Sequence, residues 1–176
     1  MRPALLLFTV LGGRTCELAN LSQILNPAIL SVIEGLDLDI QNLARAYKCV
    51  VPKITQALSA YGLGDHEKSN FRNLNLEQAL RGMGQSLLGP NLIDHSHKEP
   101  LSDQCCLNVI KRDIVETLVL LLDFARVARI QLPAINSVVE LASAVTKVDL
   151  MRHGRKVSDL GLIGYDVSEI IELINS

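Results

Sequence analysis

The sequence is poor in features on which several large classes of protein depend. Tryptophan is absent and aromatic residues make up 3% of the chain, which leaves little for stacking against bases or sugars. Lys and Arg number 17 against 19 Asp and Glu, without a large block of either sign, so we expect no nucleic-acid partner. No apolar run reaches the roughly 18 residues of a membrane-spanning helix, so no membrane partner is expected either.

The cysteines show no pattern of pairing or metal binding. None belongs to a C-x-x-C pair and zinc-site spacing is missing; the four are Cys16, Cys49, Cys105 and Cys106. We interpret them as free, buried thiols in a reducing compartment, which indicates a cytoplasmic protein. The short apolar run before Gly12 loosely resembles a signal peptide but has no clear cleavage site, so secretion is the minor alternative.

Motifs for cofactors, metals and nucleophiles are missing as well. Glycine pairs at residues 62–64 and 82–84 lack the third glycine and the βαβ setting of a dinucleotide fingerprint. His95 and His97 alternate in a loop with acidic neighbours, but such pairs are common and we predict no metal site. No G-x-S-x-G nucleophile motif occurs. We therefore expect the chain by itself to bind no cofactor and to run no complete redox reaction.

What is present is helical periodicity in a chain that is 48% apolar, enough for a real core. We predict one all-α domain over residues 1–176. A helix is expected to begin near Leu38, and a second to carry Pro52 in its first turn. Residues 1–20 are an edge segment of uncertain structure, in which one short strand is possible.

The second half of the chain predicts three longer helices. The longest carries one apolar stripe with three- and four-residue spacing, formed by Leu107, Ile110, Ile114, Leu118, Leu121, Ala125 and Ala128. Pro133 opens the next helix. A turn with three glycines (Gly154, Gly161 and Gly164) then leads to Asp166, which has capping-box spacing with Glu169 ahead of a last helix over residues 167–174.

Asp113 is the residue of the long helix that most invites a function. It lies within the apolar helix, directly after Arg112. An ionised carboxylate there must be paired, exposed or directed at a cleft. Two interpretations are equally weighted, a functional carboxylate and an exposed Asp113 paired locally with Arg112 or Lys111.

Several pieces of the chain resemble the C-terminal domain of the opine dehydrogenases, the octopine and nopaline dehydrogenase family. They are Asp113-Ile-Val-Glu-Thr-Leu-Val, Leu132-Pro133-Ala-Ile, Val139-Glu-Leu-Ala-Ser and Gly154-Arg155-Lys-Val-Ser-Asp-Leu-Gly161-Leu. The last is similar to the family's Gly-Arg-Thr-Leu-x-x-Leu-Gly-Leu signature. Upstream, Asn20-Leu-Ser-Gln-Ile-Leu-Asn26-Pro27-Ala is similar to the family's Asn-x-x-x-Ile-His-Pro stretch.

The resemblance implies a helical domain like the C-terminal domain of 6-phosphogluconate-dehydrogenase-like enzymes. In the family it follows an N-terminal Rossmann domain, which is missing from these 176 residues. The family enzymes join an amino acid to an α-keto acid and reduce the imine with NAD(P). A His exchanges a proton at the keto group, an Asp orients that His, and an Arg binds the carboxylate of the keto acid.

Carried over position by position, the resemblance places Asp113 at the family Asp. The His position holds Asn26, because Pro27 aligns with the family's Pro, and the Arg position holds Asn108. Asn26 cannot transfer a proton near neutral pH and Asn108 cannot neutralise a carboxylate. Arg112, one helical turn after Asn108, is a candidate replacement for the missing charge.

The resemblance therefore implies the substrate-binding half of an opine-dehydrogenase-like oxidoreductase, inactive as an isolated chain. The implied partners are a small amino acid or keto acid and a Rossmann-domain partner or a second copy of the chain. Three alternatives stay open: a pseudoenzyme or protein-interaction module, a fragment of a longer enzyme, and a helical domain with only chance likeness to the family.

Overall fold

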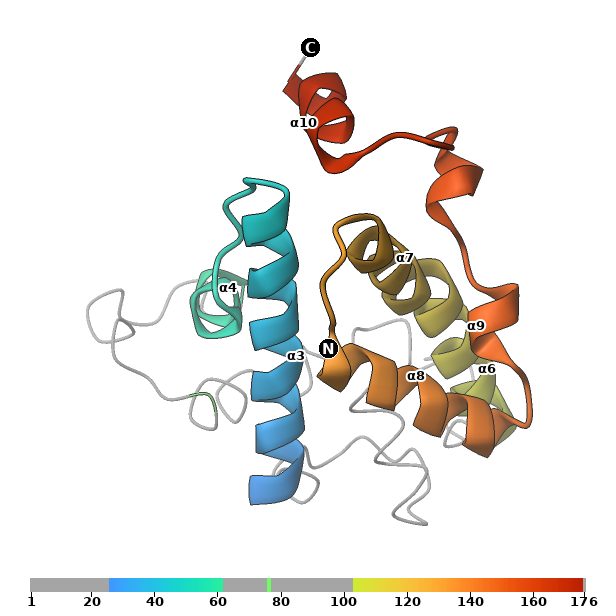
Figure 1. The fold of residues 1–176 in the computed structure, drawn as a ribbon. Helices are drawn as coiled ribbons and strands as arrows, with labels where there is room; N and C mark the ends of the chain where they lie inside the picture. The colour runs from blue at the N-terminus through green and yellow to red at the C-terminus, as the bar shows by residue number, and fades with distance from the viewer. Residues whose placement is uncertain (1–25, 62–75, 77–102, 176) are drawn as a thin grey trace. The chain divides into compact units, whose positions relative to one another are not determined.

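The structure is a computed structural model that describes residues 26–61, 76 and 103–175. The chain contacts divide it into two compact units, Met1–Glu34 with Pro52–Asn108 and Gly35–Val51 with Val109–Ser176. Every element within the described ranges is helical (Figure 1). The all-α prediction is thus confirmed for this part, whereas residues 1–20, where one short strand was left open, lie outside the described residues.

Helix α3 (Pro27–Ala46) is longer than the sequence pattern predicted. It begins at Pro27 rather than near Leu38, so the predicted start is wrong. Ile29, Ile33 and Leu36 are buried, and their spacing continues the apolar face back to Pro27. A Cβ at Gly35 would lie 3.1 Å from the Cβ of Ala134, so the backbone of α3 approaches residue 134 closely at this point.

Helix α4 (Ile54–Tyr61) follows a short connection. Pro52 precedes its first turn instead of occupying it, a small shift from the prediction. The backbone N–H of Lys53 donates to Oε1 of Gln56 at 3.1 Å and the carbonyl of Lys53 accepts from Ala57 at 2.9 Å. Lys53 is therefore the N-cap residue, directly before the first residue of the helix.

The predicted long helix is observed, but it is not regular throughout. It consists of α6 (Asp103–Asp113), a π-helical turn η4 (Ile114–Leu118) and α7 (Val119–Val127). α8 (Pro133–Thr146) follows and begins at Pro133 as predicted. In the second unit the apolar stripes of these helices meet in a core whose most buried members include Ile110, Ile114, Val119, Ile135, Val139, Leu150 and Ile170.

A buried carboxylate ties α3 to α8 within the second unit. Asp39 is 2% exposed, and its Oδ2 accepts the backbone N–H of Ile135 at 2.9 Å. Leu132, at the N-cap position of α8, makes no side-chain cap bond. Asp39 therefore caps α8 from another helix, where a negative charge is also favoured by the helix dipole.

The C-terminal segment contains two short helices where only a turn was predicted. They are α9 (Leu150–His153) and the 3₁₀ turn η5 (Val157–Leu160), ahead of α10 (Val167–Asn175). The predicted capping box of α10 is confirmed. Asp166 N–H donates to Glu169 Oε2 at 2.8 Å, and Glu169 N–H donates to Asp166 Oδ1 at 2.9 Å.

Cys49 is a free thiol, as predicted, but it is exposed. It lies just after α3 in the connection to α4, so the prediction of a buried thiol is wrong at this position. Cys16 lies outside the described residues. Among the helices of residues 26–61 and 103–175, none combines the length and apolarity needed to cross a membrane.

Candidate functional site

Asn26, the residue at the family His position, has a structural role at the start of α3. Its Oδ1 accepts the backbone N–H of Ile29 at 3.0 Å, and Pro27 is the first residue of the helix. Asn is a preferred N-cap and Pro is preferred directly after it. Local structure therefore accounts for both Asn26 and Pro27.

Asn108 and Arg112 lie four residues apart on α6, and both are exposed. The Arg112 side chain is 59% exposed, and its Nη2 lies 3.6 Å from Oδ1 of Asp113. Asn26 and Asn108 belong to the first unit, whereas Arg112 and Asp113 belong to the second. Within the second unit the structure thus brings Arg112 and Asp113 together.

Asp113 is buried, in contrast to the exposed alternative. Its residue exposure is 8%, although it is paired with Arg112 as that alternative expected. It is the last residue of α6 and directly precedes the π-helical turn. Its backbone carbonyl accepts the hydroxyl of Thr117. A nearly buried carboxylate beside an exposed guanidinium is an arrangement that can bind a charged ligand.

The π-helical turn explains why the segment that begins at Gly154 packs against residues 115–119. Val119 N–H bonds to the carbonyl of Ile114, five residues back, which releases the carbonyl of Val115 from its ordinary α-helical donor. That carbonyl accepts the backbone N–H of Arg155 at 2.9 Å. Gly154 packs directly on Val119, where a Cβ would overlap the valine side chain. The start of the segment Gly154–Leu162, which was compared with the family signature, therefore has a structural role: it packs on this turn and donates a hydrogen bond to it.

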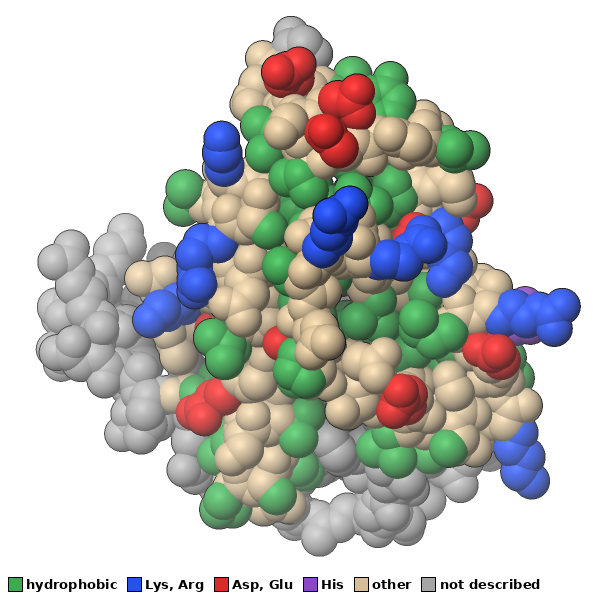
Figure 2. All heavy atoms as spheres, in the orientation of Figure 1, with side chains coloured by type: hydrophobic (Ala, Val, Ile, Leu, Met, Phe, Trp, Pro, Cys, Tyr) green, Lys and Arg blue, Asp and Glu red, His purple; other side chains and the backbone are tan. Residues whose placement is uncertain are grey.

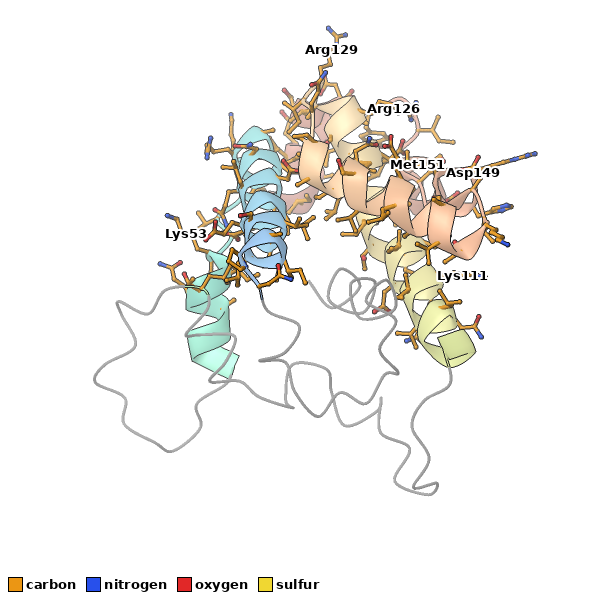
Figure 3. All side chains as sticks on the ribbon, turned by 90° about the horizontal axis from the view of Figure 1, so that it is seen from below. Lys53, Lys111, Arg126, Arg129, Asp149 and Met151 are labelled. Carbon is orange, nitrogen blue, oxygen red and sulfur yellow. The ribbon has the colours of Figure 1, made fainter. Side chains whose placement is uncertain are left out.

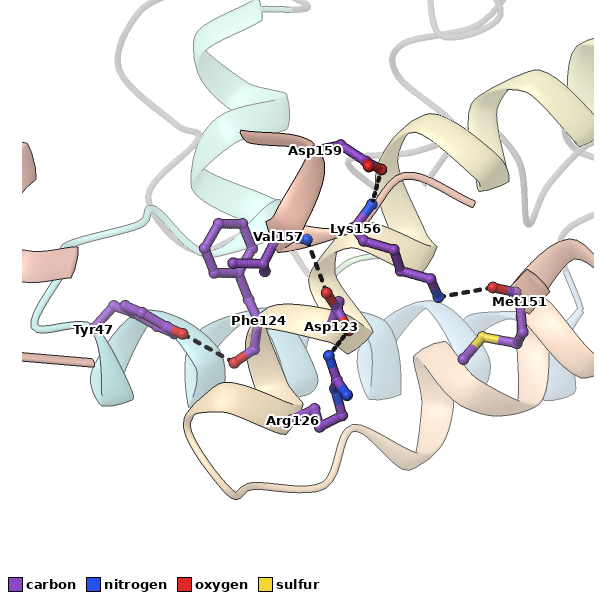
Figure 4. A network of polar contacts seen from close by, with 8 residues as sticks. All are labelled: Tyr47, Asp123, Phe124, Arg126, Met151, Lys156, Val157 and Asp159. Atoms are coloured by element: carbon purple, nitrogen blue, oxygen red, sulfur yellow. Dashed lines mark hydrogen bonds and ion pairs between the residues drawn. The ribbon is translucent and has the colours of Figure 1, made fainter. Parts of the chain in front are cut away.

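A second charged cluster, which the sequence did not single out as a site, lies on α7. Asp123 is 6% exposed; its Oδ2 accepts the N–H of Val157 at 2.8 Å, and its Oδ1 lies 2.8 Å from Arg126 Nη2 (Figure 4). Lys156 donates from Nζ to the carbonyl of Met151 at 2.7 Å. The spacing of Asp123 and Arg126 on one helix was the signal that could have found the ion pair.

Tyr47 completes this cluster from the end of α3. Its hydroxyl donates to the carbonyl of Phe124 at 3.0 Å, and the two rings meet edge to face with centroids 5.5 Å apart (Figure 4). Burial, followed by the charge of Asp123, raises the pKa of Tyr47 above its ordinary value of 10.0. Tyr47 therefore stays protonated near neutral pH and acts as a structural donor.

Two adjoining hollows open beside the Asp123 cluster. One, of about 320 Å³, is lined by Leu122, Asp123, Arg126, Met151, Lys156 and Ser158. The other, of about 390 Å³, shares Leu122, Arg126 and Met151 and adds residues from the α7–α8 connection. Volumes of this size are at the low end of small-molecule sites.

No protein-family model matches the chain, and a search of curated proteins finds no significant match. Within the described ranges, no three His, Cys, Asp or Glu side chains gather as a metal site would require. His95 and His97 lie outside those ranges, and His153 is exposed.

Proposed function

We propose that the chain binds an amino acid or α-keto acid as the substrate half of an opine-dehydrogenase-like oxidoreductase. It does not complete the reductive step by itself. The observation that carries the proposal is Asp113, a carboxylate that is 8% exposed on the long helix and lies beside the exposed guanidinium of Arg112. This pair presents opposite charges side by side.

An amino-acid zwitterion has the complementary pair of charges. The Asp113 carboxylate would accept hydrogen bonds from the ammonium group, and the planar guanidinium of Arg112 would bind the carboxylate. At 3.6 Å the Arg112–Asp113 contact is longer than a charge-assisted hydrogen bond of roughly 2.7–2.9 Å. The ammonium group of the ligand would lie beside the buried carboxylate, so Asp113 would keep a cationic partner while the exposed guanidinium turns to the ligand carboxylate.

The described residues do not fit a nicotinamide cofactor. The elements of residues 26–61 and 103–175 are all helices, whereas the dinucleotide fold needs a strand, a glycine-rich turn and a helix in succession. Asn26 caps α3 and its amide cannot transfer a proton. Hydride and proton transfer are therefore assigned to a nicotinamide-binding domain other than these residues.

Titration of the ¹⁵N-labelled chain with L-alanine tests this proposal. We expect saturable amide shift changes around residues 112–118 at millimolar ligand, the weak end of specific binding. Asp113→Asn should weaken L-alanine binding about tenfold because the ammonium group loses its charged partner. Glu116→Gln is the matched control, since Glu116 is an exposed carboxylate on the same turn and should leave the affinity unchanged.

Equal affinity in wild type and Asp113→Asn would contradict the proposal. So would shift changes that spare residues 112–118. Circular dichroism of Asp113→Asn is the check that a loss of binding is not a loss of folding.

A second candidate function is an interaction or dimerisation module. It is supported by apolar side chains that stay exposed in the C-terminal segment: Ile163 is 76%, Leu173 52% and Ile174 66% exposed. Figure 2 shows green apolar and red acidic side chains together where α10 lies in Figure 1. Light scattering distinguishes this candidate, because a strictly monomeric chain would speak against it.

A further inference from the structure

The two hollows beside α7 form one groove with an apolar part and a cationic part. Leu122, Arg126 and Met151 line both hollows, so the two adjoin each other. Ile130 and Pro133 add apolar surface on the side of the second hollow. Lys156 and Ser158 add polar groups on the side of the first. All of these residues belong to the second unit.

The balance of charge in the groove is positive. Among the described residues that line the groove, the acidic one is Asp123. One of its carboxylate oxygens accepts the N–H of Val157, and the other pairs with Arg126. A guanidinium carries five N–H donors, so its contact with Asp123 uses only part of its capacity. Lys156 is held by the Met151 carbonyl at 2.7 Å (Figure 4), which positions its charge before a ligand arrives.

From this geometry we propose that the groove binds a short aliphatic monocarboxylate. The carboxylate lies between Arg126 and Lys156, and the alkyl chain extends over Leu122 and Met151 toward Ile130. Hollows of about 320 and 390 Å³ suit a small ligand rather than a long-chain lipid. The site is separate from Arg112 and Asp113, so it stands or falls independently of the proposed function.

Hexanoate is the probe for this site. Titration into the ¹⁵N-labelled chain should give saturable shift changes at the amides of residues 122–126, 151 and 156–158. 1-Hexanol, which has the chain without the charge, and acetate, which has the charge without the chain, should each bind about tenfold more weakly or worse. Added NaCl should weaken hexanoate binding because the cations are partly exposed.

Two variants change charges at the groove without altering the apolar core, so that a loss of binding can be distinguished from a loss of folding. Lys156→Gln removes one cation, and Ser158→Asp adds a negative charge at an exposed residue of the rim. Each should raise the dissociation constant of hexanoate about tenfold. The matched controls are Arg129→Gln and Ser168→Asp, which change exposed residues that line neither hollow. In Figure 3, the Arg129 side chain points away from the helices.

Three results would overturn the proposal. The first is the absence of saturable shifts in the groove, and the second is equal binding of 1-hexanol and hexanoate. The third is an equal hexanoate affinity in Ser158→Asp and Ser168→Asp with both variants folded by circular dichroism. Failure of L-alanine to shift residues 112–118 would leave this site untouched and count only against the proposed function.

Discussion

At Gly154 the residue type is restricted by the lack of room for a side chain, and not by the backbone conformation. Its φ of −75° is one that any L-residue adopts. A Cβ at this position would nevertheless lie 2.7 Å from Cγ2 of Val119 and closer still to two other atoms of that side chain. These atoms belong to a branched side chain that is fully buried, so they cannot move aside freely.

Gly154→Ala should therefore destabilise the chain by about 1–3 kcal/mol, the usual cost of an overpacked core. Gly35→Ala is the matched control: its Cβ would lie 3.1 Å from Ala134, and alanine gains about 0.4–1 kcal/mol over glycine where the backbone permits it. Urea unfolding of both variants measures the difference. A Gly154→Ala variant as stable as Gly35→Ala would contradict the close packing of this segment on Val119.

Tyr47 carries the pH dependence expected at the residue scale. Its pKa is raised above 10.0 in the folded chain by burial and by the charge of Asp123. Below about pH 10 both states are protonated, whereas above it the unfolded chain loses the proton first. The free energy of unfolding contributed by Tyr47 is therefore present below pH 10 and falls as the pH rises through the folded pKa.

Tyr47→Phe should remove this alkaline loss and cost about 1 kcal/mol at pH 7, because the hydrogen bond to the Phe124 carbonyl is lost. Urea unfolding at pH 7 and pH 11 checks both effects. Tyr165→Phe is the control, since Tyr165 is exposed. An equal alkaline loss in wild type and Tyr47→Phe would show that the hydroxyl of Tyr47 is not desolvated as described.

At the scale of elements, the π-helical turn and the segment after α9 depend on each other. The turn leaves the Val115 carbonyl without its α-helical donor, and the Arg155 N–H supplies one at 2.9 Å. Because a buried carbonyl without a donor is costly, docking of the segment favours the irregular turn over a regular helix.

Native-state hydrogen exchange tests this coupling. The Arg155 amide should be protected about 100-fold or more relative to an exposed amide, since its N–H is bound to the helix. Arg155→Ala should retain this protection and change stability by less than about 0.5 kcal/mol, because the side chain is exposed and the backbone donor remains. Rapid exchange at residue 155 in the folded chain would contradict the contact.

Local pattern predicted the elements that have their own signals. α8 has Pro133, α10 has the Asp166–Glu169 box, and the long helix has a continuous apolar stripe. The start of α3 was missed because Gly35 hides the continuity of its apolar face. The short helices α9 and η5 were missed because each is a single turn, which is too short for periodicity to reveal.

The two candidate sites also differ in how much of each could be predicted from local sequence. Asp113 and Arg112 are neighbours in sequence, so their pairing was one of the two interpretations left open, but the burial of Asp113 depends on packing across the core. Asp123 and Val157 are 34 residues apart, and no local spacing links them. The groove between α7 and α9 could therefore be found only once the tertiary contacts were known.

For the whole molecule, the central claim is a division of labour. The proposal assigns the zwitterion of an amino acid to Arg112 and Asp113, whose opposite charges lie side by side, whereas Asn26 and Asn108 lack the proton-transfer and carboxylate-binding groups implied by the resemblance. Asn26→His with Asn108→Arg should not create activity in the chain alone. Turnover is expected only when a nicotinamide-binding Rossmann domain is supplied as well.

The most direct measurement is oxidation of NADH by the purified chain with pyruvate and either L-alanine or L-arginine. We predict no rate above the protein-free blank, because the proposed function assigns NADH binding, hydride transfer and proton transfer to a separate Rossmann domain. Clear turnover that scales with the concentration of the chain, and that is lost in Asp113→Asn, would contradict the account.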